Sequence, residues 1–500
     1  MVQTKTIKGN YKPEDVIKEE EITPFLEEDG SDFIDEQDIW QRLNNNTEPD
    51  PQRVRDIISK AYELECLSPD DVAALLHVES PELWEEIFTA AGEIKHKVYD
   101  NRIVTFAPLY CSNYCVNNCM YCGFRCENPD AQRQQLSIQE VKDEATALAG
   151  NFGHKRLIVV YGEHPKCNVD YIVDTLQAIY DTKVDTKKGY GNIRRANVNA
   201  PPLSVDDFKK VQEAGIGTYQ VFQETYHHDT YNRVHPEETI KNHYQWRLYC
   251  HHRALQADID DWGIGALFGL YDWRFEVMGL LYHSRELENR FGIGPHTISF
   301  PRLEPASNTP HPDDNKYRVS DEDFKKIVAV LRLAVPYTGM ILTARESAQV
   351  RREVIPLGIT QIDASTRIGI GAYHDQYTEQ EAEKQQFMLG DTRSLDEVAG
   401  ELADQGIIIS FCTAGYRCGR TGTHIMKLLK DGTEGTFCKA NAILTYREWL
   451  DDFASEETKA KGEKVIQKEL EEIREQNPEL YDMVAKNYNQ ISNGKRDIYV

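Results

Sequence analysis

The sequence lacks any long hydrophobic run, and positive charge is in short supply. No apolar stretch approaches the roughly 20 residues that a membrane span requires, and the N-terminal segment MVQTKTIKGNYKPEDVIKEEE has no signal-peptide core. We therefore expect an unexported, cytoplasmic protein with no membrane partner. Lys and Arg number 57 against 82 Asp and Glu, and the formal charge of -25 would repel nucleic-acid phosphates. Nucleic acid is thus not an expected partner.

Cysteine is also sparse, which excludes a disulfide scaffold. The chain of 500 residues has 11 cysteines, and they are distributed unevenly. Clusters of this kind in a reducing compartment indicate metal or redox chemistry. One cluster lies between Cys111 and Cys126 and another between Cys412 and Cys438. The remaining three are isolated and are predicted to be small buried apolar residues: Cys66, Cys167 and Cys250.

Strand-like stretches alternate with helical patterns through the middle of the chain. Alternating strands and helices predict a parallel sheet, and eight such units predict a closed (βα)8 TIM-type barrel of the α/β class. A doubly wound open sheet is the alternative. The predicted strands span 103–110, 156–162, 192–199, 218–224, 261–269, 296–303, 339–346 and 360–369. We predict a helical N-terminal extension over 1–80, the barrel over 81–404 and a C-terminal cluster-binding domain over 405–500.

The most informative motif follows the first predicted strand. Cys115, Cys119 and Cys122 have the spacing C-x-x-x-C-x-x-C. Three thiolates on a short loop can hold three irons of a [4Fe–4S] cluster and leave the fourth iron open to another ligand. A zinc knot is the alternative, because C-x-x-C is half of a zinc site, but no second pair of ligands follows within the next few dozen residues. The motif therefore favours an iron–sulfur cluster with one open iron site.

This cysteine motif resembles that of the radical S-adenosylmethionine (radical SAM) superfamily. Longer stretches resemble the HydG family of tyrosine lyases and, more distantly, the ThiH family: 215–227, 265–283, 291–306, 317–342 and 410–422. The resemblance implies that S-adenosyl-L-methionine binds the open iron and that an electron from a low-potential donor cleaves it to a 5'-deoxyadenosyl radical. It also implies L-tyrosine as substrate, with p-cresol and dehydroglycine as products.

Carried over residue by residue, the resemblance implies several site residues. Glu163 and Arg247 would contact the amino and carboxylate groups of the methionine moiety, and Tyr121 would lie in the same cofactor site. Ser299 and Arg302 are candidates for binding the substrate, although for Arg302 an ordinary salt bridge within the barrel remains open. Two glycines would bring backbone close to adenine: Gly263 and Gly265.

The resemblance further implies a second iron–sulfur cluster near the C-terminus. Cys412 and Cys438 match the first and third of its three cysteine ligands, whereas the second position is Gly415, and His283 matches an iron-binding histidine. Cys418 lies three residues beyond Gly415, and we expect it to replace the missing thiolate. The other interpretation is that the second site is lost.

Three functions remain open from the sequence. A complete HydG-type enzyme would convert dehydroglycine to carbon monoxide and cyanide on iron for [FeFe]-hydrogenase H-cluster assembly, with hydrogenase maturation proteins as partners. A lyase that stops at dehydroglycine, as in the ThiH family, is the second. The third is a non-catalytic scaffold that carries an iron–sulfur cluster or zinc. The resemblance favours a tyrosine lyase.

Overall fold

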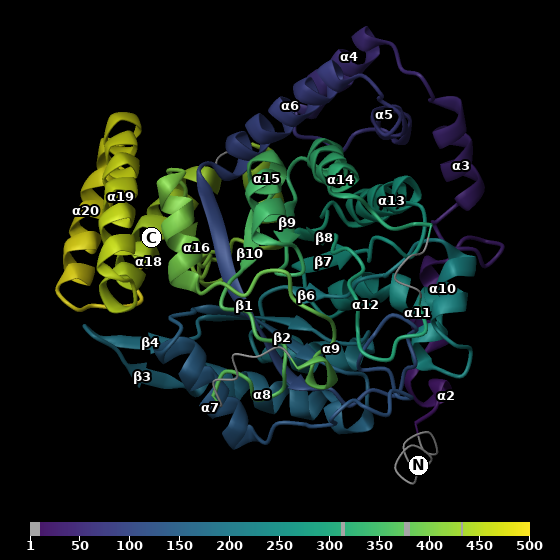
Figure 1. The fold of residues 1–500 in the computed structure, drawn as a ribbon, viewed down its shortest axis with the longest axis horizontal. Helices are drawn as coiled ribbons and strands as arrows, with labels where there is room; N and C mark the ends of the chain where they lie inside the picture. Colours follow the sequence, from purple (N-terminus) through teal and green to yellow (C-terminus); the bar gives the residue numbers. More distant parts are fainter. Residues whose placement is uncertain (1–10, 312–315, 375–380, 432–433) are drawn as a thin grey trace.

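The structure is a computed structural model that describes residues 11–311, 316–374, 381–431 and 434–500. Its centre is a barrel surrounded by helices, with the first helices along one side and the last three at another (Figure 1). The final helices, α18 (Glu434–Asp452), α19 (Glu456–Gln476) and α20 (Pro478–Ser492), form the separate group at the left of this view. The barrel therefore carries helices from both ends of the chain.

Eight parallel strands form the barrel, and each predicted strand stretch overlaps one of them. The strands are β1 (Arg102–Ser112), β2 (Arg156–Tyr161), β5 (Arg195–Asn199), β6 (Tyr219–Gln220), β7 (Trp262–Gly265), β8 (Thr297–Ser299), β9 (Gly339–Leu342) and β10 (Gln361–Asp363). Val104–Phe106 of β1 pairs with Gln361–Asp363 of β10, which closes the sheet. The predicted TIM-type barrel is confirmed, and the open doubly wound sheet is wrong.

The strands form because their sequences suit a sheet that is covered on both faces. Every residue of β1 is buried, and four of its eleven residues are Ile, Val, Thr or Phe. Serine side chains cap several of the crossover helices by accepting a backbone hydrogen bond within the first turn. These caps are Ser137, Ser204, Ser320 and Ser394. Local sequence thus sets where each helix of the alternation begins.

Helices cover the outside of the barrel and build its N-terminal extension. The extension contains α2 (Pro13–Val16), α3 (Glu36–Asn45), α4 (Pro51–Ala61) and α5 (Pro69–Leu75), and it leads into α6 (Pro81–Tyr99). The barrel helices are α7 (Ile138–Gly150), α8 (Val169–Asp181), α9 (Val205–Glu213), α10 (His228–Val234), α11 (Tyr244–Leu248), α12 (Cys250–Gln256), α13 (Trp273–Phe291), α14 (Asp321–Ala334), α15 (Ala348–Gly358) and α16 (Leu395–Asp404). α3 and α5 pack on α13, so the extension is fixed to the barrel wall.

Two strand pairings lie outside the predicted alternation. β3 (Lys183–Asp185) and β4 (Tyr190–Asn192) form a small antiparallel hairpin. β11 (Ile408–Ser410) pairs in parallel with Arg102–Val104 at the start of β1. The C-terminal segment therefore begins as an added strand at the amino-terminal end of the barrel, before α17 (Gly422–Lys430). No helix in the described part of the chain is long and apolar enough to cross a membrane.

Candidate functional site

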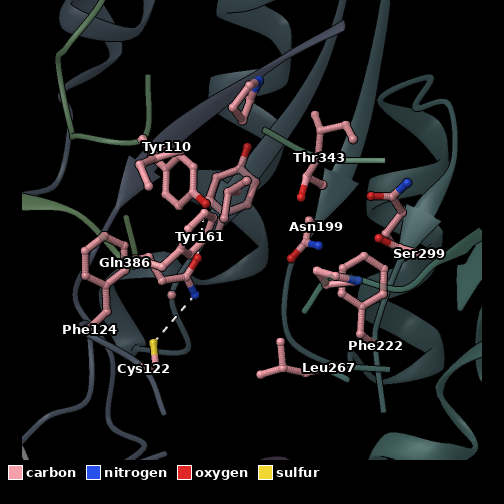
Figure 2. Close-up of a pocket in the computed structure, with 18 of the residues that line it drawn as sticks. Tyr110, Cys122, Phe124, Tyr161, Asn199, Phe222, Leu267, Ser299, Thr343 and Gln386 are labelled. Atoms are coloured by element: carbon pink, nitrogen blue, oxygen red, sulfur yellow. Dashed lines mark hydrogen bonds between the residues drawn. The ribbon is translucent and has the colours of Figure 1, made fainter. Parts of the chain in front are cut away.

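A cavity of about 230 Å³ opens at the carboxyl ends of the barrel strands. Figure 2 shows aromatic side chains, including Tyr110, Tyr161 and Phe222, around a central space with Cys122 at one side. Residues on or just after every barrel strand line it: Tyr110, Val160, Asn199, Gln220, Leu267, Ser299, Ile341 and Asp363. This is where a TIM-type barrel collects its functional side chains, because the eight strand ends converge there.

The loop after β1 brings the first three cysteines to this cavity. Cys115, Cys119 and Cys122 all line it. The loop is held by backbone hydrogen bonds to neighbouring segments, among them Val116 N to the Glu163 carbonyl oxygen (2.8 Å) and Met120 N to the Val234 carbonyl oxygen (3.0 Å). The three thiols are therefore positioned by the barrel rather than by the loop alone.

Gly162, at the end of β2, lies directly against this loop. A Cβ atom at Gly162 would stand 2.1 Å from the Tyr114 carbonyl oxygen, a distance that no real contact allows. Because the obstructing atom belongs to the backbone, only glycine permits this approach. The cysteine loop and the second strand are thus in close backbone contact beside Cys115.

The environment of the thiols suits cluster ligands. Burial raises the pKa of Cys115 to about 12 and that of Cys119 above its usual range, so metal binding would displace their protons. Gln386 donates a hydrogen bond to the Cys122 sulfur at 3.6 Å (Figure 2). No group of three or more His, Cys, Asp or Glu side chains converges on one point among the described residues. A cubane does not require such convergence, because each thiolate binds a different iron.

A charged group faces the cysteine loop from the connection between β6 and β7. Lys241 Nζ lies 2.6 Å from Glu224 Oε1, and Arg247 Nη2 lies 3.5 Å from the same oxygen. Burial would raise the pKa of Glu224, but these two cations hold it below its usual value. Glu224 also has a φ of 73°, a left-handed conformation that is strained for a residue with a side chain. The structure keeps this carboxylate ionised and aimed at the cavity.

Glu163 lies near this group, beside the cysteine loop. Its carboxylate accepts a hydrogen bond from Asn117 Nδ2, and Asn117 Oδ1 accepts one from the Lys241 backbone N at 3.0 Å. Burial raises the pKa of Glu163. The predicted cofactor residues Glu163 and Arg247 are therefore both brought to the cavity, in one hydrogen-bonded system with Asn117, Lys241 and Glu224.

Tyr121 also lines the cavity, and its hydroxyl lies 2.8 Å from Nε2 of His235. Burial, together with the charges of Lys241 and Arg247, drives the pKa of His235 well below its usual value. His235 is therefore neutral, so Nε2 accepts when Tyr121 donates. This contact holds the tyrosine ring against His235.

Arg345, just beyond β9, brings a further positive charge to the cavity. Its guanidinium carbon lies 3.4 Å from the centroid of the Phe387 ring. Its side chain forms no ion pair within 4.0 Å in the part of the chain that the structure describes. Burial lowers the pKa of this guanidinium, with Tyr110 and Glu224 acting in the opposite direction. A half-buried cation without a paired carboxylate is suited to an anionic ligand.

Of the residues predicted to contact substrate or adenine, some line the cavity and others do not. Ser299 lines the cavity, whereas Arg302 does not. The Arg302 guanidinium lies 2.7 Å from Asp321 Oδ1 and also pairs with Glu346, so its donors are used by the barrel itself. Gly265 does not line the cavity, but a Cβ atom there would stand 2.6 Å from the Phe222 ring. Its role in this structure is to let Phe222, a lining residue, pack against β7.

Gly263 is likewise buried in β7 and does not line the cavity. A Cβ atom there would stand 2.6 Å from Thr297 Oγ1 of the next strand and 2.9 Å from Gln220 Cγ. The glycine therefore allows close packing of side chains across three adjacent strands. Its expected contact with adenine remains a prediction.

Several lining residues carry no predicted role. Glu224 and Arg345 stand at the ends of predicted strands, a position that marks functional residues in barrels, so that signal was present in the sequence. Lys241 and Gln386 lie in loops distant from the motif and give no such signal. Only the tertiary structure brings these two to the cysteines, because both loops fold back over the strand ends.

The second cysteine group lies at the opposite, amino-terminal end of the barrel. Cys412, Gly415 and Cys438 line a cavity of only about 10 Å³ next to the first residue of β1. Cys418 is exposed and does not line this cavity. The expected grouping of Cys412, Cys418 and Cys438 is therefore not formed, because the turn after Gly415 directs Cys418 to the surface. As they stand, the donors of this site do not fit a three-thiolate cluster.

His283 does not face this second site. It is buried on α13, where its Nδ1 lies 2.9 Å from the Tyr226 hydroxyl and its ring centroid lies 5.4 Å from that of Phe33. It is thus part of the contact between the N-terminal extension and the barrel wall. A different histidine, His296 before β8, lies at the amino-terminal end, where its Nδ1 is 3.6 Å from Asp261 Oδ2.

Comparisons with known proteins show which families this chain is similar to. Residues 109–276 match the radical SAM superfamily, and residues 299–408 match the biotin and thiamin synthesis associated domain. The 2-iminoacetate synthase of Escherichia coli (strain K12) is 30% identical over 75% of this chain and 93% of its own length.

Two solved structures are similar over nearly the whole chain. The crystal structure of HydG, a maturase of the [FeFe]-hydrogenase, is 47% identical with a TM-score of 0.88 and covers 94% of this chain and 100% of that chain. HydG from Carboxydothermus hydrogenoformans is 36% identical with a TM-score of 0.75 and covers 95% and 99%.

Proposed function

We propose that this chain, which belongs to the radical SAM superfamily of enzymes in the group that includes HydG and 2-iminoacetate synthase, is an L-tyrosine lyase. The observation that carries the proposal is the carboxyl-end cavity, where three thiols on one loop stand beside two glutamates and two guanidinium groups. The products would be p-cresol and dehydroglycine, with a low-potential electron donor as the redox partner.

The three thiols of the β1 loop are the proposed ligands of the cofactor. Cys115, Cys119 and Cys122 would hold a [4Fe–4S] cluster that leaves one iron open. When bound, this cluster and S-adenosyl-L-methionine would supply a 5'-deoxyadenosyl radical at the cavity. The aromatic lining, including Tyr121 and Phe222, would exclude water from that space.

The charged residues provide complementary contacts for the methionine moiety. Glu163 is an acceptor for its amino group and is already oriented by Asn117. Arg247 uses Nε for the Phe222 carbonyl oxygen and one Nη for Glu224, so its remaining N–H donors are available for the carboxylate. Two opposite charges held by the barrel would fix the position of the sulfonium relative to the cluster.

Arg345 is the proposed anchor for the tyrosine carboxylate. Its charge faces the cavity without an ion-pair partner among the described residues, whereas Arg302 is paired with Glu346 and Asp321. We assign Arg302 to the support of β8 and its neighbours rather than to substrate. Ser299 lines the same cavity and would hold the substrate amino group in place for hydrogen removal.

Product analysis tests the proposal. The full chain would be reconstituted anaerobically with iron and sulfide and incubated with S-adenosyl-L-methionine, tyrosine and a strong reductant. We expect 5'-deoxyadenosine and p-cresol in comparable amounts. Deoxyadenosine without p-cresol would contradict tyrosine as the substrate, and the absence of both from a chain that has bound its cluster would favour a non-catalytic scaffold.

A further inference from the structure

The proposed activity does not determine whether the small cavity at the amino-terminal end of the barrel binds a second iron–sulfur cluster. Cys412, Gly415 and Cys438 line it, and its volume of about 10 Å³ leaves room for about one water molecule at most. A cubane needs one protein thiolate on each of three irons when the fourth iron is left for another ligand. Cys412 and Cys438 are the only two cysteines that line this space among the described residues.

Position 415 has room for the side chain that it lacks. Gly415 has φ −49° and ψ −50°, which any residue adopts. A Cβ atom there would find its nearest neighbours at 3.8 Å (the Arg420 carbonyl oxygen) and 4.0 Å, ordinary contact distances. Gly422 in the same segment is different, since its φ is 53° and a Cβ atom would stand 2.2 Å from Asp260 Oδ2. The fold requires glycine at 422 but not at 415.

Cys418 cannot take the place of this side chain without dismantling the turn that contains it. The preceding Tyr416 lies under the Arg195 guanidinium, 3.5 Å from ring centroid to carbon. Its hydroxyl accepts a hydrogen bond from Arg195 and donates one to Asp261, two residues of the barrel's amino-terminal end. The turn itself is closed by Cys418 N bonding to the Ala414 carbonyl oxygen at 3.1 Å. These contacts direct the Cys418 side chain to solvent.

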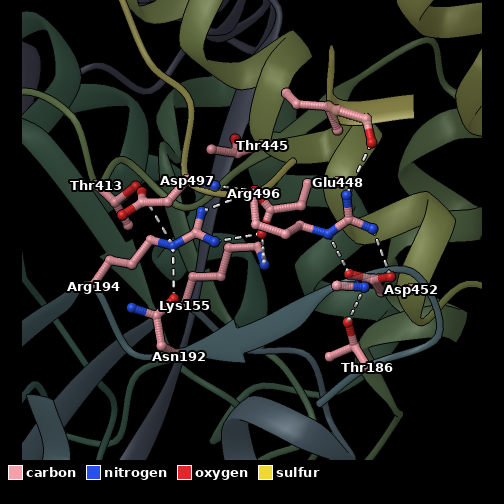
Figure 3. Close-up of polar contacts among 12 residues, drawn as sticks. Lys155, Thr186, Asn192, Arg194, Thr413, Thr445, Glu448, Asp452, Arg496 and Asp497 are labelled. Atoms are coloured by element: carbon pink, nitrogen blue, oxygen red, sulfur yellow. Dashed lines mark hydrogen bonds and ion pairs between the residues drawn. The ribbon is translucent and has the colours of Figure 1, made fainter. Parts of the chain in front are cut away.

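The C-terminal tail holds the same turn from its outer side. Arg417 Nη1 lies 2.8 Å from both carboxylate oxygens of Asp497. Figure 3 shows Asp497 beside Arg194 of the barrel, which in turn pairs with Glu448 of α18. The Arg194 and Glu448 side chains are almost completely buried. The turn is therefore fixed between the barrel and the C-terminal helices.

We infer that the C-terminal cysteines of this chain do not assemble a second [4Fe–4S] cluster, because the third thiolate is missing at position 415 and Cys418 does not supply it. The segment from Cys412 to Arg420 instead closes the amino-terminal end of the barrel, with Tyr416 bound between Arg195 and Asp261. A consequence, which rests on the proposed tyrosine lyase activity, is that dehydroglycine leaves as the product and is not converted to carbon monoxide and cyanide by this chain.

Iron content tests the inference without relying on activity. The background is the full chain with Cys115, Cys119 and Cys122 replaced by Ala, reconstituted anaerobically with ferrous iron and sulfide. We expect no stoichiometric iron in this background. Adding Gly415→Cys should raise the content to about four irons per chain with the absorption and electron paramagnetic resonance signals of a cubane. Gly415→Ala, which adds the Cβ atom without the thiol, is the matched control and should bind none.

Two outcomes would overturn the inference. Stoichiometric iron in the background would show that a second cluster forms, and its loss on Cys418→Ala would identify the ligand. A Gly415→Cys background that keeps the circular dichroism and Tm of its Gly415→Ala control but gains no iron would show that 415 is not the missing position. Failure of tyrosine cleavage would leave these counts unchanged, so the two proposals fail separately.

Discussion

The two ends of the barrel differ in how their charged side chains are used. At the carboxyl end a cavity of about 230 Å³ remains open, Arg345 faces it, and Glu224 is held in a strained conformation. At the amino-terminal end about 10 Å³ remains, and Arg195 and Asp261 are occupied by Tyr416. Open space and a charge that faces it accompany a site for ligands, whereas at the other end the space is filled and Tyr416 binds both Arg195 and Asp261.

The largest expected effect distinguishes the two cysteine groups. Cys119→Ala should abolish deoxyadenosine formation, because two thiolates cannot hold the proposed cluster with one open iron. Cys412→Ala, at the other end, should leave deoxyadenosine and p-cresol formation near the parental rate. Anaerobic turnover assays with quantified products measure both. Comparable losses in the two variants would contradict the division between a catalytic end and a structural end.

The close contact between Gly162 and the cysteine loop should also be sensitive to substitution. Gly162→Ala places a Cβ atom 2.1 Å from the Tyr114 carbonyl oxygen, so the loop must shift. We expect a loss of about 1–3 kcal/mol in the free energy of unfolding together with reduced iron binding. Gly435→Ala on α18 is the control, since its nearest neighbour would lie 4.0 Å away, and helix propensity predicts a gain of about 0.4–1 kcal/mol. Denaturant titration and iron analysis would record the pair.

The two arginines proposed for different tasks should respond differently to the same change. Arg345→Lys removes a planar two-point contact to the substrate carboxylate, so p-cresol formation should fall roughly 10- to 100-fold while S-adenosyl-L-methionine cleavage continues. Arg302→Lys should instead lower Tm, because Glu346, with a side chain only 2% exposed, loses part of its pairing. The ratio of deoxyadenosine to p-cresol separates the roles. Uncoupling by the Arg302 variant alone would reverse our assignment.

The smallest expected effects concern the pH dependence of stability. One contact, at His228, should lose its stabilising effect as pH rises, and another, at Glu448, should lose it as pH falls. Burial would lower the pKa of His228 on α10, but Asp32 and Glu36 of the N-terminal extension raise it to about 9. A raised pKa gives stability that is complete below the unfolded value of about 6.5 and is lost as pH rises toward 9. Tm should therefore fall less between pH 6 and pH 9 in His228→Gln than in the parent.

Stability at low pH depends on Glu448 of α18, which pairs with Lys155 and Arg194. Burial would raise the pKa of Glu448, but Lys155 and Arg194 lower it to about 2. A lowered pKa gives stability that is complete above the unfolded value of about 4.3 and is lost as pH falls toward 2. Glu448→Gln should flatten the fall of Tm between pH 5 and pH 3, and His228→Gln should not. A parent-like acid profile in the Glu448 variant would argue against this pairing as a stabilising contact.

The barrel and the cysteine motif were open to prediction because both are local properties of the chain. Each of the eight strands lies within a stretch of alternating or continuous apolar residues, and the three thiols of the β1 loop are separated by a spacing that one loop can present. Once a strand is known to belong to a parallel barrel, the direction of its carboxyl end follows. Glu163 and Ser299 could be placed near the cysteines for that reason.

The tertiary structure alone decided which charges are free to act and which are already paired. Arg302 and Arg345 both follow barrel strands, yet only the packing of Glu346 and Asp321 around Arg302 distinguishes them. Likewise the sequence places Cys418 three residues from Gly415. Because Tyr416 is hydrogen-bonded to the barrel, however, the thiol of Cys418 points outward. Spacing along a chain determines which side chains can meet on one loop. Whether they do meet depends on contacts from distant segments, which no local pattern contains.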